Sequence, residues 1–135
     1  MFVDASAIVA ILRGEPRGAG LLEAIKAAPT RLTSPIAIWE AAVAMRRETS
    51  LTVDDARESV EDFLIYMRIE TASLGSVDAV MALDAFARYG KKYHPARLNM
   101  GDCFAYACAK VHKVPLLYIG NDFALTDVNE GFKDS

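Results

Sequence analysis

Short apolar segments alternate with longer segments of helical periodicity along this chain, and this alternation is the strongest constraint on its fold. Strands are expected at Phe2–Val3, Arg31–Thr33, Arg68–Leu74 and Val114–Ile119, and helices at about 7–12, 18–28, 35–47, 52–67, 77–89 and 100–112. Strands separated by helices favour an α/β domain, and right-handed crossovers then place helices on both sheet faces. We therefore predict a central, short-stranded parallel sheet flanked by helices on both faces.

Polar residues mark where several of these helices begin. Ser6, Ser34, Ser76 and Asn99 each precede a predicted helix, and such side chains accept hydrogen bonds from the first backbone N–H groups of a helix. In the segment 77–89 we expect the core positions to be Val80, Met81, Leu83 and Ala87.

Length and composition fit one domain over residues 1–135. Of the 135 residues, 53% are hydrophobic and 24% charged, which suffices for a packed core. No apolar run approaches the roughly 20 residues of a membrane helix, and the start Met-Phe-Val-Asp lacks a signal-peptide pattern. We expect a cytoplasmic protein without membrane insertion. Cys103 and Cys108 match no zinc-ligand spacing, and on one helix they face differently, so we expect two thiols.

Acidic residues follow the first and last predicted strands. Asp4 ends the first strand, and Asp122 comes shortly after Ile119. Ligands of open α/β sheets bind beyond the carboxyl ends of the strands, where these two carboxylates would meet. The alternatives are ordinary ones: Asp4 caps the next helix unless Ser6 does so, and Asp122 is a loop residue.

Glu40 and Asp102 lie on predicted helices with apolar surroundings. The neighbours of Glu40 one turn away are Ile36, Ala37, Val43 and Ala44, so its side chain should face inward. A buried carboxylate needs a cation or an ion pair, for which Arg13 or Arg31 is the alternative. Asp102 opens a helix that is apolar nearly all round, although an acid in a first turn also favours the helix dipole.

Four carboxylates at one sheet edge would repel one another. Two unit charges about 4 Å apart cost about 4 kcal/mol at an effective dielectric near 20. A divalent cation removes this cost, and oxygen ligands suit Mg²⁺ or Mn²⁺, which also bind substrate phosphates. Such a site can activate a water molecule for hydrolysis of a phosphate ester.

Four segments, in this order along the chain, share a pattern with one known family. They are FVDAS at 2–6, SPIAIWE at 34–40, LNMGDCFAYA at 98–107 and PLLYIGNDFALTD at 115–127. Together they resemble the PIN-domain ribonucleases, specifically the VapC-type toxins of type II toxin–antitoxin pairs, over residues 2 to about 128.

The resemblance implies an acidic quartet of Asp4, Glu40, Asp102 and Asp122, with Asp4 and Asp102 as direct ligands of Mg²⁺ or Mn²⁺. Ser6 matches the residue that supports the first acid. Asn121 stands where some relatives carry a further acid, which Asp127 could partly replace, although we favour a turn role for Asp127. The implied activity is cleavage of cellular RNA, with tRNA or rRNA as substrate, which stops translation. The implied partners are a VapB-like antitoxin and a second copy of the chain.

Basic residues give the candidate RNA contacts in a chain whose net charge is −3, from 15 Lys+Arg and 18 Asp+Glu. The candidates are Arg13 and the cluster of Arg88, Lys91, Lys92, His94 and Arg97, which could equally form a solvated loop. We interpret Arg46 and Arg47 as charge complements of a helix C-terminus, and Trp39 as a core residue.

Two other functions remain open from the sequence. One is a phosphatase-like α/β hydrolase with Asp4 as nucleophile, although position 6 is Ser where such enzymes usually carry a second acid. The other is a non-catalytic interaction module whose acids serve only as caps and ion-pair partners.

Overall fold

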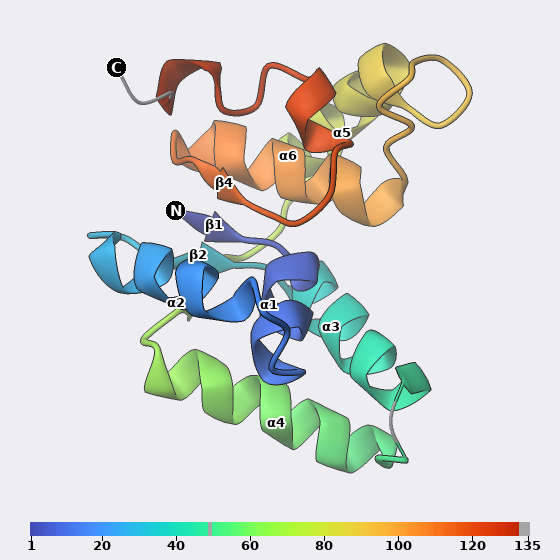
Figure 1. Cartoon of the computed structure of the whole chain (residues 1–135). Coiled ribbons are helices and arrows are strands. Elements are labelled where there is room, and N and C mark those ends of the chain that lie inside the picture. Colours follow the sequence, from blue (N-terminus) through green and yellow to red (C-terminus); the bar gives the residue numbers. More distant parts are fainter. Residues whose placement is uncertain (49, 133–135) are drawn as a thin grey trace.

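The computed structural model describes the backbone of residues 1–48 and 50–132 as one α/β domain (Figure 1). The strands are β1 (Phe2–Val3), β2 (Leu32–Thr33), β3 (Glu70–Thr71) and β4 (Leu116–Leu117). The helices are α1 (Ala5–Leu12), α2 (Gly18–Ala27), α3 (Pro35–Glu48), α4 (Val53–Tyr66), α5 (Ser76–Tyr89) and α6 (Met100–His112), followed by the 3₁₀ turns η1 (Phe123–Leu125) and η2 (Glu130–Phe132). Among the described residues, no helix combines the length and apolar character that crossing a bilayer requires.

The four strands form one parallel sheet in the order β3-β2-β1-β4. Phe2 pairs with Leu32 on one side and with Leu116 on the other. All carboxyl ends therefore lie along one edge, and the chain segments after β1 and β4 emerge next to each other. In Figure 1 the strands lie between α6 on one side and α1 and α2 on the other. The predicted fold class, a short-stranded parallel sheet between helices, is confirmed.

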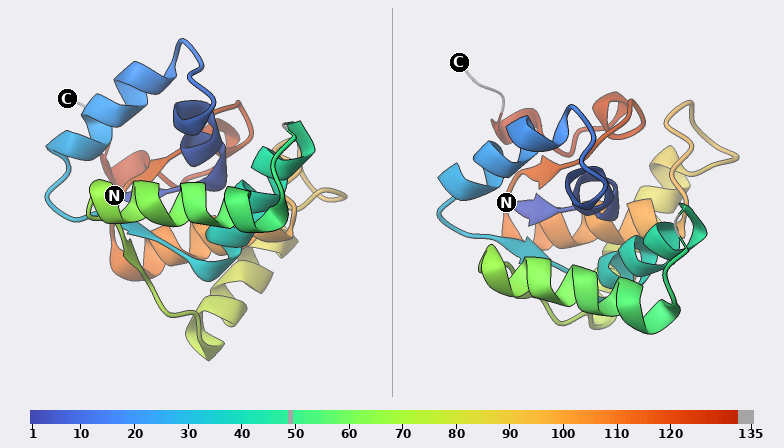
Figure 2. Two further views of the ribbon diagram at one scale, coloured as in Figure 1. Left: turned by 90° about the horizontal axis from the view of Figure 1, so that it is seen from below. Right: turned by 60° about the horizontal axis from the view of Figure 1, so that its bottom comes forward.

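Helices supply most of the core because each strand is only two residues long. In the turned views of Figure 2, α4 lies across the outside of the N-terminal half, where it packs on α3 and α1. Burying a large apolar side chain stabilises the folded state by roughly 1.5–3 kcal/mol. The largest completely buried apolar side chains are Phe2, Val3, Ile8, Ile25, Val60 and Leu98.

Two of the four predicted helix caps are correct. The hydroxyl oxygen of Ser34 accepts the N–H of Ala37 (3.1 Å), and Oδ1 of Asn99 accepts the N–H of Asp102 (2.9 Å). The prediction for Ser6 is wrong: α1 begins at Ala5 and its cap is Asp4. The prediction for Ser76 is also wrong, because α5 begins at that residue and the capping position is Gly75.

Of the four core positions predicted in α5, Met81 is partly buried against the core, whereas the other three are exposed. Val80 is 60% exposed and Leu83 is 68% exposed, whereas Ala82 and Ala85 are buried. The physical reason is close packing of α5 on α6, which small alanine side chains permit and larger ones prevent. Since α5 carries apolar residues on several faces, hydrophobic periodicity could not tell which face the neighbouring helix covers.

Candidate active site

The site begins at the carboxyl end of β1 with Asp4, which is only 6% exposed. Its Oδ2 atom accepts hydrogen bonds from the backbone N–H of Ser6 (3.1 Å) and from the hydroxyl group of Ser6 (2.6 Å). Burial raises the pKa of Asp4, and the hydrogen bonds from Ser6 offset this effect only in part. Asp4 therefore caps α1 and also places a buried carboxyl group at the edge of the sheet.

Ser6 connects the start of α1 to the segment after β4. Its hydroxyl group donates to Asp4 and accepts the backbone N–H of Ile119 (3.0 Å). The backbone N–H of Asp4 donates to the carbonyl oxygen of Leu117 (3.0 Å). These bonds hold the ends of β1 and β4 together and orient the Asp4 carboxylate, which is the supporting role predicted for Ser6.

Glu40 reaches the same site from α3, on the inward face that its apolar neighbours predicted. Its carboxylate lies against Gly101 at the start of α6, and a Cβ atom added to Gly101 would overlap both Glu40 carboxylate oxygens. The lack of a side chain at Gly101 therefore creates the space that Glu40 occupies. The sequence signal for this contact is the glycine that stands one residue before Asp102.

The described residues show no ion pair between Glu40 and a basic side chain. The Arg13 guanidinium lies 3.6 Å from Glu15, and Arg31 donates to the backbone carbonyl groups of Lys26, Ala28 and Met67. The alternative of an ion pair with Arg13 or Arg31 is therefore wrong. Burial, together with the charges of Asp4 and Asp102, raises the pKa of Glu40 to about 7.

Asp102 lies in the first turn of α6 and forms a capping box with Asn99. Its Oδ2 atom accepts the backbone N–H of Asn99 (3.1 Å). Burial, together with the charges of Asp4 and Asp122, raises the pKa of Asp102 to about 6 against the effect of this hydrogen bond. The Asp102 carboxylate can therefore stabilise the N-terminus of α6 and also belong to the acidic site.

Asp122 and Asn121 lie in the exposed loop between β4 and η1. The effect of Asp122 on the pKa of Asp102 places the two carboxylates within electrostatic range. Asp122 is not among the residues that line the acidic cavity, so its place in the acidic quartet stays a prediction, and Asn121 precedes it in the same loop.

Asp127 lies in a separate cluster that attaches the C-terminal segment to α5 and α6. It accepts the hydroxyl group of Tyr106 (2.5 Å) and pairs with Arg88 (3.5 Å) and Lys110 (3.4 Å). Burial opposes ionisation of Asp127, but the hydrogen bond from Tyr106 and the two cations outweigh it and lower its pKa. Asp127 is not among the residues that line the acidic cavity, so its interactions here are structural.

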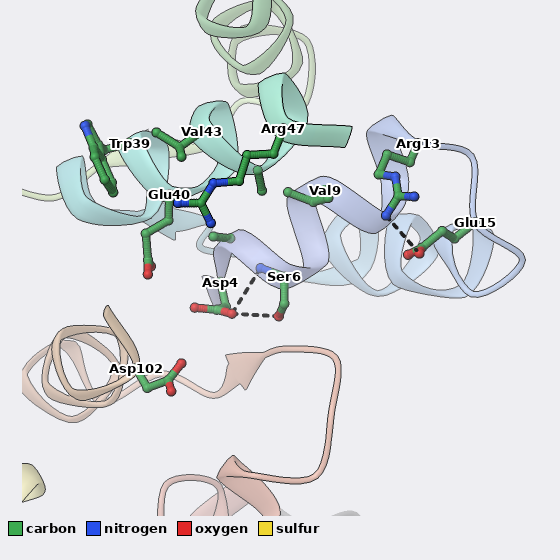
Figure 3. Close-up of a pocket in the computed structure, with 12 residues that line it drawn as sticks. Asp4, Ser6, Val9, Arg13, Glu15, Trp39, Glu40, Val43, Arg47 and Asp102 are labelled. Atoms are coloured by element: carbon green, nitrogen blue, oxygen red, sulfur yellow. Dashed lines mark hydrogen bonds and ion pairs between the residues drawn. The ribbon is translucent and has the colours of Figure 1, made fainter. Parts of the chain in front are cut away.

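Asp4, Glu40 and Asp102 line one cavity of about 440 Å³ between α1, α3 and the start of α6 (Figure 3). Two other lining residues were assigned different roles from the sequence. Trp39, predicted to be core, is 64% exposed at the cavity. Arg47, predicted to complement a helix end, extends from α3 along the same wall (Figure 3). The lining residues are Asp4, Ala5, Ser6, Val9, Arg13, Glu15, Trp39, Glu40, Val43, Ala44, Arg47 and Asp102.

The basic segment predicted to contact RNA leads into α6 but does not line this cavity. Lys91, Lys92 and Arg97 are exposed in it, and His94 accepts the backbone N–H of Ala96 (3.0 Å). Arg88 is held by Asp127 and stacks over the ring of Tyr89 (4.8 Å to its centroid).

The donor groups fit a hard divalent cation. They are carboxylate oxygens, whose raised pKa values report that the site disfavours negative charge without a counter-ion. Within the described ranges, however, no three acidic, histidine or cysteine side chains stand close enough to form a ready-made metal cluster. The side chains would have to move inward, or water would have to complete the coordination shell, which is usual for Mg²⁺.

Comparison with known proteins identifies the family. The sequence model of the PIN-domain family matches residues 1–129, so the chain belongs to that family. A VapC ribonuclease of Rhizobium meliloti is 42% identical over 139 residues, covering 94% of this chain and 98% of the relative. Ribonuclease VapC42 of Mycobacterium tuberculosis is 37% identical over 130 residues, covering 95% and 96%. The resemblance predicted from the four sequence segments is confirmed.

A solved structure shows the same fold. The crystal structure of Mycobacterium tuberculosis VapC20, described as a Sarcin-Ricin loop cleaving toxin, superposes with a TM-score of 0.70 at 14% identity. The match covers 91% of this chain and 92% of that one. The likeness in fold therefore covers most of both chains.

The raised pKa values predict how stability and metal binding depend on pH. The folded, metal-free protein holds protons on Glu40 and Asp102 more tightly than the unfolded chain does. The stability that this contributes is lost as pH rises, from 4.5 to about 7 for Glu40 and from 3.8 to about 6 for Asp102. Mn²⁺ binds the ionised carboxylates, so its effect on the unfolding temperature should grow over the same range. Thermal unfolding near pH 5 and pH 7.5, with and without Mn²⁺, measures both effects. Glu40→Gln should fold, flatten the pH dependence and reduce the Mn²⁺ shift; an undiminished shift would count against a ligand role.

The contact between Gly101 and Glu40 predicts a second result. Gly101→Ala should displace the Glu40 carboxylate and reduce the Mn²⁺-induced shift, while helix propensity changes stability by only about 1 kcal/mol. Gly20→Ala in α2, where an added Cβ meets open space, is the matched control and should keep the full shift. Equal Mn²⁺ shifts in the two variants would show that Gly101 does not position Glu40.

Proposed function

We propose that this chain is a Mg²⁺- or Mn²⁺-dependent endoribonuclease toxin of a type II toxin–antitoxin pair. One observation supports this most strongly: carboxylates from the end of β1, from α3 and from α6 line one cavity and have no basic ion-pair partner among the described residues. The charges of Asp4 and Asp102 raise the pKa of Glu40, and the charge of Asp4 raises that of Asp102. The relatives named VapC ribonucleases support the choice of RNA as substrate. PIN-domain ribonucleases generally use a divalent metal.

Asp4 and Asp102 are the proposed direct metal ligands, and Glu40 and Asp122 complete the site directly or through water. The ion would supply charge neutralisation and a water molecule activated for attack on a phosphodiester. The chain's own contribution is positioning: Ser6 orients Asp4, and the backbone of Asn99 orients Asp102.

The proposed substrate is cellular RNA, with tRNA or rRNA as the favoured class, and its cleavage would stop translation. Arg13 lies at the cavity and is the nearest of the predicted phosphate contacts. Lys91, Lys92 and Arg97 remain proposed contacts for more distant phosphates, and Arg88 would first have to leave Asp127.

Cleavage of total RNA by the purified, antitoxin-free protein tests the proposal. We expect cleavage with Mg²⁺ or Mn²⁺, none with EDTA, and a loss of at least about 100-fold in Asp4→Asn and Asp102→Asn. Asp62→Asn, the same charge change on the exposed surface of α4, should retain full activity. Activity that survives EDTA or both site substitutions would refute the assignment. Intact RNA together with a phosphoryl group on Asp4 would favour the phosphatase alternative.

Two protein partners belong to the proposal, and both would act in the cytoplasm. A VapB-like antitoxin would insert a basic side chain that neutralises the carboxylates and displaces the metal. A second copy of the chain would cover the apolar groove between α5 and α6, whose exposed residues include Leu83 (68%), Phe86 (37%) and Met100 (62%). Contiguous apolar surface of this kind commonly marks an interface.

A charged substitution in this groove tests the dimer. Leu83→Asp should convert a dimer into a 14.7 kDa monomer, because a carboxylate at an apolar contact would lose its hydration. Ile65→Asp, a similarly exposed aliphatic position on α4, is the control and should remain dimeric. Sedimentation velocity measures both; a monomeric wild-type chain or a dimeric Leu83→Asp variant would contradict this assembly.

A further inference from the structure

One face of α3 forms a wall of the acidic cavity. Its residues recur at helical spacing, with Trp39 and Glu40 on one turn, Val43 and Ala44 on the next, and Arg47 beyond them. Ala37 and Ala41, on another face, are 2% and 0% exposed, so the helix is anchored in the core. Side chains on this wall are therefore presented to the cavity by a fixed backbone. Glu40 belongs to the acidic site, whereas Trp39 and Arg47 have no role assigned so far.

Trp39 is the only tryptophan of the chain, and it is 64% exposed next to Glu40. A flat aromatic ring beside a phosphodiester-cleaving site offers a stacking surface for a nucleobase. Such stacking tolerates every base, because every base has a π-face.

Arg47 is a cation on the same wall that does not neutralise the acids. Its side chain runs back along α3 toward the end of the cavity where Glu40 lies (Figure 3). In the part of the chain that the structure describes, no carboxylate lies within ion-pair distance of Arg47, whereas Arg13 pairs with Glu15. The guanidinium group is thus available for an anion that enters the cavity, and a phosphate suits its geometry.

We propose that Trp39 and Arg47 form a nucleotide-binding subsite beside the acidic cluster. Trp39 stacks an unpaired base, and Arg47 binds a phosphate adjacent to the one that would be cleaved at the acidic site. From Glu40 to Arg47 the helix rises by about 10 Å, and the Arg47 side chain spans part of that length. One RNA strand can therefore contact the acidic site and the Arg47 guanidinium group at the same time. This inference rests on the proposed ribonuclease function and adds that the RNA must be unpaired at the subsite.

The lone tryptophan provides a direct test. Asp4→Asn protein, which should bind RNA without cutting it, is titrated with a short single-stranded RNA oligomer of mixed sequence while fluorescence anisotropy reports binding. We expect RNA to quench the Trp39 emission in step with binding, and the same oligomer annealed to its complement to quench it much less, because paired bases cannot stack on the ring.

Substitutions separate the two contacts. Trp39→Ala should weaken RNA binding about 5- to 100-fold with an unchanged salt dependence, and Trp39→Phe should lose less. Arg47→Ala should weaken binding and lower the slope of log K against log salt by about 0.7, the value for one phosphate contact on a single strand. Arg46→Ala, the same charge change outside the cavity, and Tyr66→Ala, an 82% exposed aromatic on α4, are the matched controls. All variants should keep the unfolding temperature of the wild type.

Several outcomes would overturn the subsite. RNA binding without a change in Trp39 emission would exclude stacking, and equal effects of Arg47→Ala and Arg46→Ala would exclude a specific phosphate contact. Tighter Mn²⁺ binding by Arg47→Ala, without weaker RNA binding, would show instead that Arg47 is a counter-charge for the acids. An emission change that follows protein concentration without RNA would place Trp39 in a protein interface. If the wild type cleaves RNA while these variants bind it normally, only the subsite fails; if the wild type cleaves no RNA, the proposed function fails.

Discussion

Mutual repulsion among partly buried carboxylates is the constraint on which the rest of this structure depends. Asp4, Glu40 and Asp102 come from three elements and are held by neutral contacts: a serine hydroxyl group, a backbone N–H and a glycine without a side chain. The protein thus fixes the positions of the acids without cancelling their charge. The divalent ion that we propose would convert this electrostatic cost into binding free energy.

The sheet and the C-terminal segment also position the acidic residues. Strands of two residues contribute little core, but their parallel pairing brings the ends of β1 and β4 together. The hydrogen bond from Ile119 to Ser6 then joins those ends. Beyond them, Asp127 attaches the segment after η1 to Tyr106 and Lys110 on α6, which holds the Asp122 loop near the site. Residues outside the cavity therefore contribute to its geometry.

Hydrophobic pattern along the chain predicted the side-chain orientation correctly for Glu40 but not for Trp39 and Leu83. Glu40 was found because all its neighbours one turn away are apolar, and in the structure its side chain faces inward to the site. Trp39 was assigned to the core because it is large and apolar, but it lies on the wall that α3 presents to the cavity. Leu83 failed for a related reason: α6 covers the alanine face of α5 and leaves the larger side chains exposed. Side-chain size alone does not tell which face a neighbouring helix covers.

The sequence by itself determined the order of strands and helices along the chain, the parallel sheet class and the family, and it named the candidate acids. Each of these depends on local periodicity or on motifs within short segments. Only the tertiary structure decided that Gly101 makes room for Glu40, that Arg47 shares the acidic cavity and that Asp127 belongs to a separate ion-pair cluster. Those facts depend on how segments distant in the chain pack against one another, and hydrophobic burial, which drives that packing, has no direction that a local pattern could record.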